Sequence, residues 1–200
     1  MRAVSGVAAI VLAAGASRRL GRPKQTVLLG GEMLVERAVL VAMEAGLSPV
    51  IVVVREGAEF AERLRERECV IAVNAEPEEG MAASIRCGVA AAAGAAGAVV
   101  MACDQPGLRA EHLQALVAEP ERVTGSRYAD RTGVPAYFPA KEFPSLLGLR
   151  GDAGARERLR EAAFVVAEEL ALDVDTEADV ELARRQADFP PPRTFRAKYS

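Results

Sequence analysis

The sequence contains no tryptophan and only one histidine, His112, among its 200 residues. A single histidine excludes a metal site built from several histidines and argues against a Ser-His-Asp triad. The three cysteines, Cys69, Cys87 and Cys103, form neither a CxxC pair nor a zinc-ligand spacing. Cys103 ends an apolar run, a position typical of a small core residue. These absences direct attention away from imidazole and thiol chemistry.

The chain also lacks a surplus of basic residues and a long hydrophobic run. Its formal net charge of −3 argues against a nucleic-acid partner, although a few cations and backbone N–H groups suffice to hold a small nucleotide. The apolar stretch Val7–Ala14 is too short to span a membrane. An odd number of cysteines and the lack of a signal peptide are typical of a reducing compartment. We therefore expect a soluble, cytoplasmic protein with no membrane partner.

Half of the residues are hydrophobic, which is enough for one core in a single domain spanning residues 1–188. In the first 118 residues, short runs rich in Val, Ile and Ala alternate with segments of helical periodicity. The pattern predicts strands at Val7–Leu12, Val50–Val54, Val70–Val73 and Ala98–Ala102, and helices at Leu34–Ala42, Ala58–Arg67, Met81–Ala93 and Arg109–Ala118. Such alternation builds an α/β fold, in which helices cover both faces of a parallel sheet.

Beyond residue 120 the pattern is weaker. It predicts strands at Arg122–Arg127 and Val134–Phe138, a loop entering a helix over Gly151–Ala163, a strand within Phe164–Val174 and a last helix at Thr176–Asp188. Thr176 is the expected N-cap of that helix, with Asp179 three residues later. Three consecutive prolines mark residues 189–200 as a tail outside the domain.

The loops that follow Leu12, Val73 and Ala102 should open on one edge of the sheet, where ligands of such folds bind. In the loop Leu12–Lys24, Gly15 and Gly21 permit positive φ angles, so that backbone N–H groups can point at phosphate oxygens. Arg19 and Lys24 add positive charge. From these residues alone, a flexible basic surface loop is an equally good interpretation. The loop is neither a Walker A motif nor a GxGxxG fingerprint.

The order L-A-A-G-x-S-x-R-x-G-x-P-K after an N-terminal strand resembles the signature of nucleotidyltransferases. It resembles most closely the molybdenum cofactor cytidylyltransferases and their guanylyltransferase relatives. The resemblance implies a three-layer, Rossmann-like fold with a mostly parallel central sheet. It also implies that the loop wraps a nucleotide and contributes Leu12, Ala13, Ala14, Gly15 and Ser17, with Arg19 and Lys24 on the phosphates.

Two further segments resemble that family. Asp104-Gln105-Pro106 matches its metal-binding Asp-x-Pro, so that Asp104 would hold Mg²⁺ on the phosphates. Gly80-Met81-Ala82-Ala83-Ser84, preceded by Asn74, resembles a Gly-Met-x-x-Ser segment beside the base and ribose. Without the resemblance, Asp104 would be a turn or N-cap residue, and the second segment would be an ordinary start of a helix.

A late segment, Asp173-Val174-Asp175-Thr176, resembles the family's closing Asp-hydrophobic-Asp-Thr. Asp175 could supply a second carboxylate to the metal, or Asp173 and Asp175 could order the entrance of the last helix. Gly133-Val134-Pro135 and Gly151–Arg156 resemble segments of the half that receives the acceptor. The cytidylyltransferases often have His where Val134 stands, which leaves the acceptor's identity open.

The resemblance implies transfer of CMP from CTP to the phosphate of molybdopterin, with release of pyrophosphate. We expect CTP because the methyl group of Ala14 replaces a glycine of the guanylyltransferases and would narrow the base pocket. Another small phosphorylated acceptor, or GTP as donor, is an alternative. A non-catalytic partner in maturing a molybdenum hydroxylase is less consistent with intact Asp104, Lys24 and Arg19. A nicotinamide dehydrogenase would need a GxGxxG turn.

Overall fold

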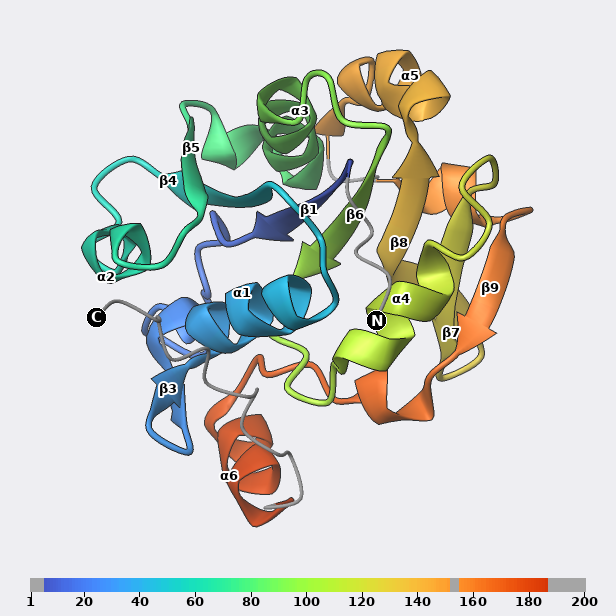
Figure 1. Cartoon of the computed structure of the whole chain (residues 1–200). Coiled ribbons are helices and arrows are strands. Elements are labelled where there is room, and N and C mark those ends of the chain that lie inside the picture. Colours follow the sequence, from blue (N-terminus) through green and yellow to red (C-terminus); the bar gives the residue numbers. More distant parts are fainter. Residues whose placement is uncertain (1–5, 152–154, 187–200) are drawn as a thin grey trace, which may run out of the picture.

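A seven-stranded sheet forms the centre of the molecule (Figure 1). The computed structural model describes residues 6–151 and 155–186, so the proposed tail lies outside the described residues. The strand order is β5-β4-β1-β6-β8-β7-β9. The strands are β1 (Val7–Leu12), β4 (Val50–Arg55), β5 (Val70–Asn74), β6 (Gly97–Ala102), β7 (Thr124–Tyr128), β8 (Arg131–Pro139) and β9 (Ala163–Val166).

Helices cover both faces of the sheet, which confirms the three-layer α/β fold. One face carries α1 (Leu34–Glu44), α2 (Ala61–Arg65) and α4 (Ala110–Leu116), and the other carries α3 (Met81–Ala91) and α5 (Phe143–Leu147). The buried residues form one apolar cluster on each side. Most strand pairs are parallel; β8 is antiparallel to both β6 and β7.

β1 lies in the middle because its side chains are apolar on both faces. Ala9, Ile10 and Val11 are fully buried between β4 and β6. Helix α3 packs directly on this strand, since Gly88 has no side chain. A Cβ atom at Gly88 would lie 2.2 Å from Cγ2 of Ile10. The buried parallel strands predicted from the sequence are therefore confirmed, and the structure adds the close packing of α3 on β1.

The ligand edge follows from the strand register. Leu12 pairs with Ala102, so the loops after β1 and β6 leave the sheet side by side. Because β8 runs antiparallel to β6, with Ala136 opposite Val100, its first residues lie at this same edge. A segment of the second half of the chain therefore reaches the edge that the sequence assigned to three loops of the first half.

Helix α6 (Glu177–Arg185) begins as predicted at Thr176, whose backbone N–H donates to Asp179 Oδ2 at 2.8 Å. The hydroxyl of Thr176 accepts from the Asp179 backbone N–H at 3.3 Å, which completes a capping box. Val180 of α6 packs in a small cluster with Leu20 of the first loop. This contact holds the segment before α6 against the loop after β1.

The local structure differs from the predictions at several places. The helix predicted at Ala58–Arg67 is shorter in the structure, where α2 spans only Ala61–Arg65. The described part of Gly151–Ala163 contains a 3-10 helix at Arg156–Leu159 where an α-helix entrance was expected, and residues 152–154 lie outside the description. The strand within Phe164–Val174 is β9, which a 3-10 helix at Glu168–Ala171 follows. The sequence also missed α5 and the hairpin of β2 (Leu28–Leu29) and β3 (Glu32–Met33), because elements this short show no period.

Candidate functional site

The loop after β1 is shaped by Ser17 and Gly21, which have φ angles of 50° and 72°. The carbonyl oxygen of Ser17 accepts from the backbone N–H of Leu20 at 3.1 Å and from that of Gly21 at 3.2 Å. The hydroxyl of Ser17 accepts from the backbone N–H of Lys24 at 2.9 Å. Gly15 does not adopt the positive φ angle that a glycine permits, and a Cβ atom there would meet no atom within 4 Å. Gly15 therefore borders open space.

Gln25 is a structural residue of this loop that the sequence did not reveal. Its side chain is buried, and Nε2 donates to the carbonyl oxygens of Ala13 and Gly15, each at 2.9 Å. These bonds connect the two ends of the loop across eleven residues of chain. A polar residue after Pro-Lys carries no periodic signal, so only the tertiary contacts identify it.

Four charged side chains from three distant segments meet beside the loop. The ammonium group of Lys24 donates to the carboxylate of Asp104 and, at 2.8 Å, to Oδ1 of Asp175. Arg19 Nη2 lies 2.6 Å from Oδ2 of Asp175. Lys24 and Asp104 are mostly buried, with side-chain exposures of 18% and 13%. The structure thus brings together the four residues that the sequence had proposed for phosphate and metal binding.

The protonation of Lys24 follows from its partners. Burial by itself lowers the pKa of an ammonium group, but the negative charges and hydrogen bonds of Asp104 and Asp175 outweigh it and raise the pKa of Lys24. Lys24 is therefore a permanent cation at neutral pH. Burial, together with the charge of Asp104, raises the pKa of the neighbouring Cys103 thiol to about 12. Cys103 is thus an inert core residue, as the sequence predicted.

The carboxylates fit a divalent cation that takes most of its ligands from phosphate and water. Oδ1 of Asp104 is buried and has no hydrogen-bond partner within the described chain. Its other oxygen shares Lys24 with Asp175. Within residues 6–151 and 155–186, no group of three or more His, Cys, Asp or Glu side chains could form an all-protein cage. One or two carboxylates with phosphate oxygens are the usual protein ligands of Mg²⁺.

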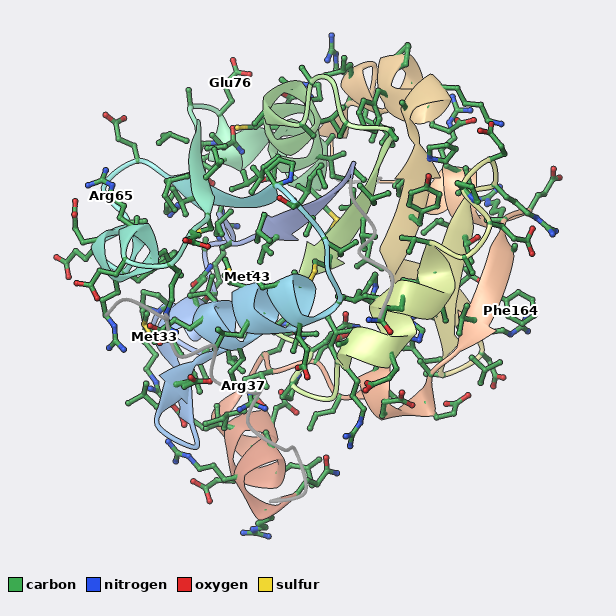
Figure 2. All side chains as sticks on the ribbon, viewed as in Figure 1. Met33, Arg37, Met43, Arg65, Glu76 and Phe164 are labelled. Carbon is green, nitrogen blue, oxygen red and sulfur yellow. The ribbon has the colours of Figure 1, made fainter. Side chains whose placement is uncertain are left out.

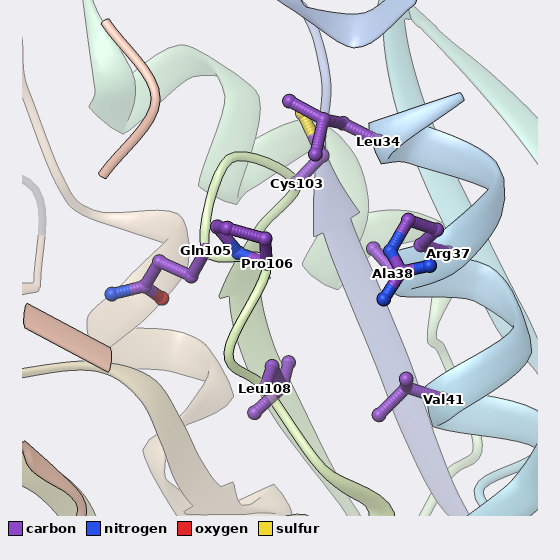
Figure 3. A pocket seen from close by; sticks show the side chains of 8 residues that line it. All are labelled: Leu34, Arg37, Ala38, Val41, Cys103, Gln105, Pro106 and Leu108. Atoms are coloured by element: carbon purple, nitrogen blue, oxygen red, sulfur yellow. The ribbon is translucent and has the colours of Figure 1, made fainter. Parts of the chain in front are cut away.

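The turn that carries Asp104 is anchored on two sides. Nε2 of the buried Gln105 donates to the hydroxyl of Tyr128 at 3.0 Å and to the Leu170 carbonyl oxygen at 3.2 Å. The carbonyl oxygen of Asp104 accepts from the Val174 backbone N–H at 2.9 Å. Toward α1, the turn leaves only a cavity of about 10 Å³, shown in Figure 3. That volume suits at most a water molecule, so the cavity is no ligand site.

The segment around Gly80 connects the end of β5 to the start of α3 at the ligand edge. Gly80 has a φ angle of 103°, and Met81 is 48% exposed. Asn74 and Ser84 are buried and hydrogen-bonded to each other, with Nδ2 donating to Oγ at 3.1 Å. This bond connects β5 to α3. The contact of Asn74 and Ser84 with a base stays a prediction.

Glu78 ties this segment to the first loop. It pairs with Arg18 at 3.3 Å and with Arg55 at 2.8 Å. An open pocket of about 410 Å³ lies between the first loop and the loop after β4. Its lining includes Ala13, Gly15, Ala16, Pro23, Gln25, Thr26, Arg55 and Phe60. We call it the loop pocket.

The methyl group of Ala14 does not line the loop pocket. Ala14 is 4% exposed and packs in the apolar cluster on the α3 side, close to the partly buried Leu12. An effect of Ala14 on the choice of base would therefore act through the packing beneath the ligand edge. This placement alters the route of the expected effect and leaves the effect itself a prediction.

Val134 lies beside the Asp104 turn, where β8 begins. The Tyr128 hydroxyl that accepts from Gln105 also donates to the Val134 carbonyl oxygen at 2.9 Å. A Cβ atom at Gly133 would come within 3.1 Å of this hydroxyl, so the small residue makes room for Tyr128. Tyr128 thus joins the turn to the Gly133-Val134-Pro135 segment, a connection that the sequence did not predict.

The sequence matches one known protein family. The sequence profile of the family described as "MobA-like NTP transferase domain" matches residues 9–167. The match includes the first loop, the Gly80 segment and the Asp104 turn. No helix among the described residues is both long enough and apolar enough to cross a membrane.

Three relatives of similar sequence carry different names. "Purine catabolism protein PucB" of Bacillus subtilis is 32% identical over 194 residues, which cover 88% of this chain and 95% of that protein. "Nicotine blue oxidoreductase" of Paenarthrobacter nicotinovorans is 33% identical over 172 residues, covering 80% and 84%. A "probable molybdenum cofactor guanylyltransferase" of Opitutus terrae is 42% identical over 106 residues, about half of each chain (53% and 52%).

Among solved structures, Rv0371c of Mycobacterium tuberculosis superposes with a TM-score of 0.77 at 29% identity, covering 92% of this chain and 100% of that one. A complex of Rv0371c with manganese superposes with a TM-score of 0.73 at 26% identity, covering 91% and 100%.

Proposed function

The chain belongs to the family of MobA-like NTP transferase domains, and we propose that it transfers a nucleotidyl group from a nucleoside triphosphate to the phosphate of a molybdopterin-type acceptor. The observation that carries the proposal is the convergence of Lys24, Asp104 and Asp175 beside the loop after β1. The relative named for molybdenum cofactor guanylylation supports the acceptor class.

Asp104 and Asp175 are the proposed ligands of Mg²⁺. The unpartnered Oδ1 of Asp104 and the shared contact of both carboxylates with Lys24 support this assignment. The manganese complex of Rv0371c supports a divalent cation in this fold. When bound, the ion would neutralise phosphate charge and polarise the α-phosphorus.

The protein side chains do the remaining work by alignment and charge. An acceptor phosphate is already an anion, so the attack on the α-phosphorus needs no protein base. The P–O bond to the β-phosphate breaks, and pyrophosphate leaves. The backbone N–H groups of the loop, with Lys24 and Arg19, would stabilise the negative charge on that leaving group. Lys24 would exchange one of its carboxylate partners for a phosphate oxygen.

A transfer assay tests the proposal. With CTP labelled at the α-phosphate, Mg²⁺ and molybdopterin, we expect labelled dinucleotide and an equal amount of pyrophosphate. Asp104→Asn should lower the turnover on the order of 10³-fold while the protein stays folded. If the wild-type protein forms no dinucleotide from either CTP or GTP, transfer to molybdopterin is wrong.

We propose CTP as the preferred donor, because the methyl group of Ala14 adds volume beneath the ligand edge, at a position where guanylyltransferases have glycine. With Mg²⁺ present, CTP should raise the melting temperature more than GTP does. Ala14→Gly should reduce that difference. Equal or better protection of the wild-type protein by GTP contradicts the preference.

The relative named as an oxidoreductase shows why family membership alone does not fix the reaction. A cofactor-binding maturation partner is the second candidate. It requires no turnover, so Asp104→Asn should leave delivery of the molybdenum cofactor to a hydroxylase unchanged. If delivery persists and nucleotide transfer is absent in the wild-type protein, this second function replaces the first.

A further inference from the structure

A second open pocket lies on the other side of Asp104 from the loop pocket. In the strand order, β1 and β4 lie on one side of β6, and β8 and β7 lie on the other. The second pocket has a volume of about 380 Å³ and is lined by Arg131, Thr132, Leu159 and Arg160. We call it the arginine pocket. Asp104, in the turn after β6, thus follows the strand that lies between the elements of the two pockets.

The floor of the arginine pocket, next to β7, is well packed. A Cβ atom at Gly125 of β7 would lie 2.6 Å from Cγ2 of Thr132 and 3.4 Å from Cδ2 of Leu159. The bare glycine therefore lets both side chains rest on the sheet. Leu159 is almost fully buried and closes the pocket toward the core. The pocket consequently has an apolar floor beneath two cationic side chains.

The two guanidinium groups differ in their partners. Arg131 Nη2 lies 3.1 Å from Oδ2 of Asp173, and its guanidinium carbon lies 5.2 Å from the ring centre of Tyr128. These contacts orient Arg131. Arg160 is exposed and forms no ion pair with any other described residue. The pocket thus has one oriented and one available guanidinium group, and such groups bind oxyanions with charge-assisted hydrogen bonds.

The pocket is connected to the charged cluster through a short segment. Asp173, the partner of Arg131, precedes Asp175, the partner of Lys24, by two residues. Between them, the Val174 backbone N–H donates to the carbonyl oxygen of Asp104. The segment Asp173–Asp175 therefore contacts both Arg131 of the arginine pocket and the turn that carries Asp104.

We propose that the arginine pocket binds an anionic group of the acceptor other than the phosphate that attacks. The inference rests on the proposed transfer reaction, because two substrates must meet at Asp104 from different directions. The loop after β1 provides the backbone N–H groups and cations for the triphosphate. The arginine pocket provides fork-shaped donors for a second oxyanion, such as another phosphate or an oxo group of a bound metal.

Titration of the full-length protein with inorganic phosphate and, separately, with molybdate tests the pocket without any turnover. At constant ionic strength, both probes should cause saturable shifts in the Nε–Hε resonances of Arg131 and Arg160. Arg160→Gln should weaken binding about tenfold, as expected for loss of a charge-assisted bond. Arg158→Gln, two residues earlier in the chain and outside the lining, should change it less than twofold.

The preferred probe distinguishes the source of the oxyanion: molybdate indicates the metal-bearing end of the acceptor, and phosphate indicates a second phosphate. Absence of saturation, or equal weakening by both substitutions, overturns the proposal. In the transfer assay, Arg160→Gln should raise the KM for molybdopterin about tenfold and change the KM for CTP less than twofold. If the wild-type protein transfers no nucleotide, the proposed function fails, and the titration alone decides about the pocket.

Discussion

The two sides of Asp104 have different structures, and we propose that they bind different substrates. On the loop side, a buried parallel strand ends in a loop that carries Lys24 and Arg19. On the other side, the first residue of β8 is Arg131, and Arg160 directly follows the 3-10 helix at Arg156–Leu159. Phosphates are common to all nucleoside triphosphates, so a backbone loop suffices for them. An acceptor differs between enzymes, and side chains on a hairpin can change without altering the sheet.

The largest expected effect on turnover comes from a substitution of Lys24, on the loop side of Asp104. Lys24→Met removes the cation between Asp104 and Asp175 and should reduce turnover on the order of 10³-fold. Steady-state transfer assays measure it. Lys141→Met is the matched control, since Lys141 is half-exposed and, among the residues that the structure describes, forms an ion pair only with the exposed Glu121 at 3.3 Å. Equal losses in both variants contradict a specific role of Lys24.

Two glycines separate binding from stability on the loop side. Gly15→Ala adds a methyl group to open space and should leave the free energy of unfolding within about 0.5 kcal/mol. It should weaken CTP binding about tenfold, because the methyl group enters the space that faces the phosphates. Gly88→Ala forces a methyl group onto Ile10 and should destabilise the fold by about 1–3 kcal/mol.

Urea unfolding and calorimetric CTP titration measure the two quantities. The contrast is the test. If Gly15→Ala binds CTP as tightly as the wild-type protein, the loop does not hold the nucleotide as proposed. If Gly88→Ala is as stable as the wild-type protein, the close packing of α3 on β1 is wrong.

Tyr128→Phe sharpens the comparison by uncoupling the two sides. It removes the hydroxyl that connects Gln105 to the Val134 carbonyl oxygen and should destabilise the protein by about 1–2 kcal/mol. It should also raise the KM for the acceptor more than the KM for CTP. Tyr137→Phe, which loses only a hydroxyl bond of 2.8 Å to the Pro120 carbonyl oxygen, should affect stability alone. Identical kinetics of the two variants contradict the coupling.

The smallest effect concerns His112, which lies on α4 against β7. Burial lowers the pKa of His112, although the charge of Glu169 partly opposes it. The folded state therefore favours the neutral ring, which donates to Ser126 Oγ at 2.7 Å while that hydroxyl donates to the Pro135 carbonyl oxygen. This contribution is complete above the ordinary pKa of about 6.5 and is lost as the pH falls toward the lowered folded pKa.

Urea unfolding at pH 7.5 and pH 5.5 measures this contribution. His112→Asn should lose roughly 0.5–1 kcal/mol less than the wild-type protein between these pH values. The chain has no other histidine, so carboxylates are the only other side chains expected to titrate near this range. An identical loss in both proteins contradicts a lowered pKa of His112.

The two sides also differ in how well the sequence predicted them. The sequences of β1, β4 and β6 are continuous apolar runs. Such runs are easy to recognise as strands, because a strand that is buried on both faces has apolar residues at every position. On the other side, β9 alternates in burial, and Phe164 projects from its outer edge with 47% exposure (Figure 2). The adjoining 3-10 helices are too short to produce a period. Prediction accordingly succeeded where burial was complete.

The sequence by itself determined the α/β alternation and indicated the family, because these depend on local residue order. It predicted that the loops of Lys24 and Asp104 open on one edge of the sheet, but not which of their atoms meet. Only the tertiary structure decided that one ammonium group holds both carboxylates. It also revealed Gln25, the Tyr128 connection and the arginine pocket, because those contacts depend on strand register between distant segments, which no local pattern encodes.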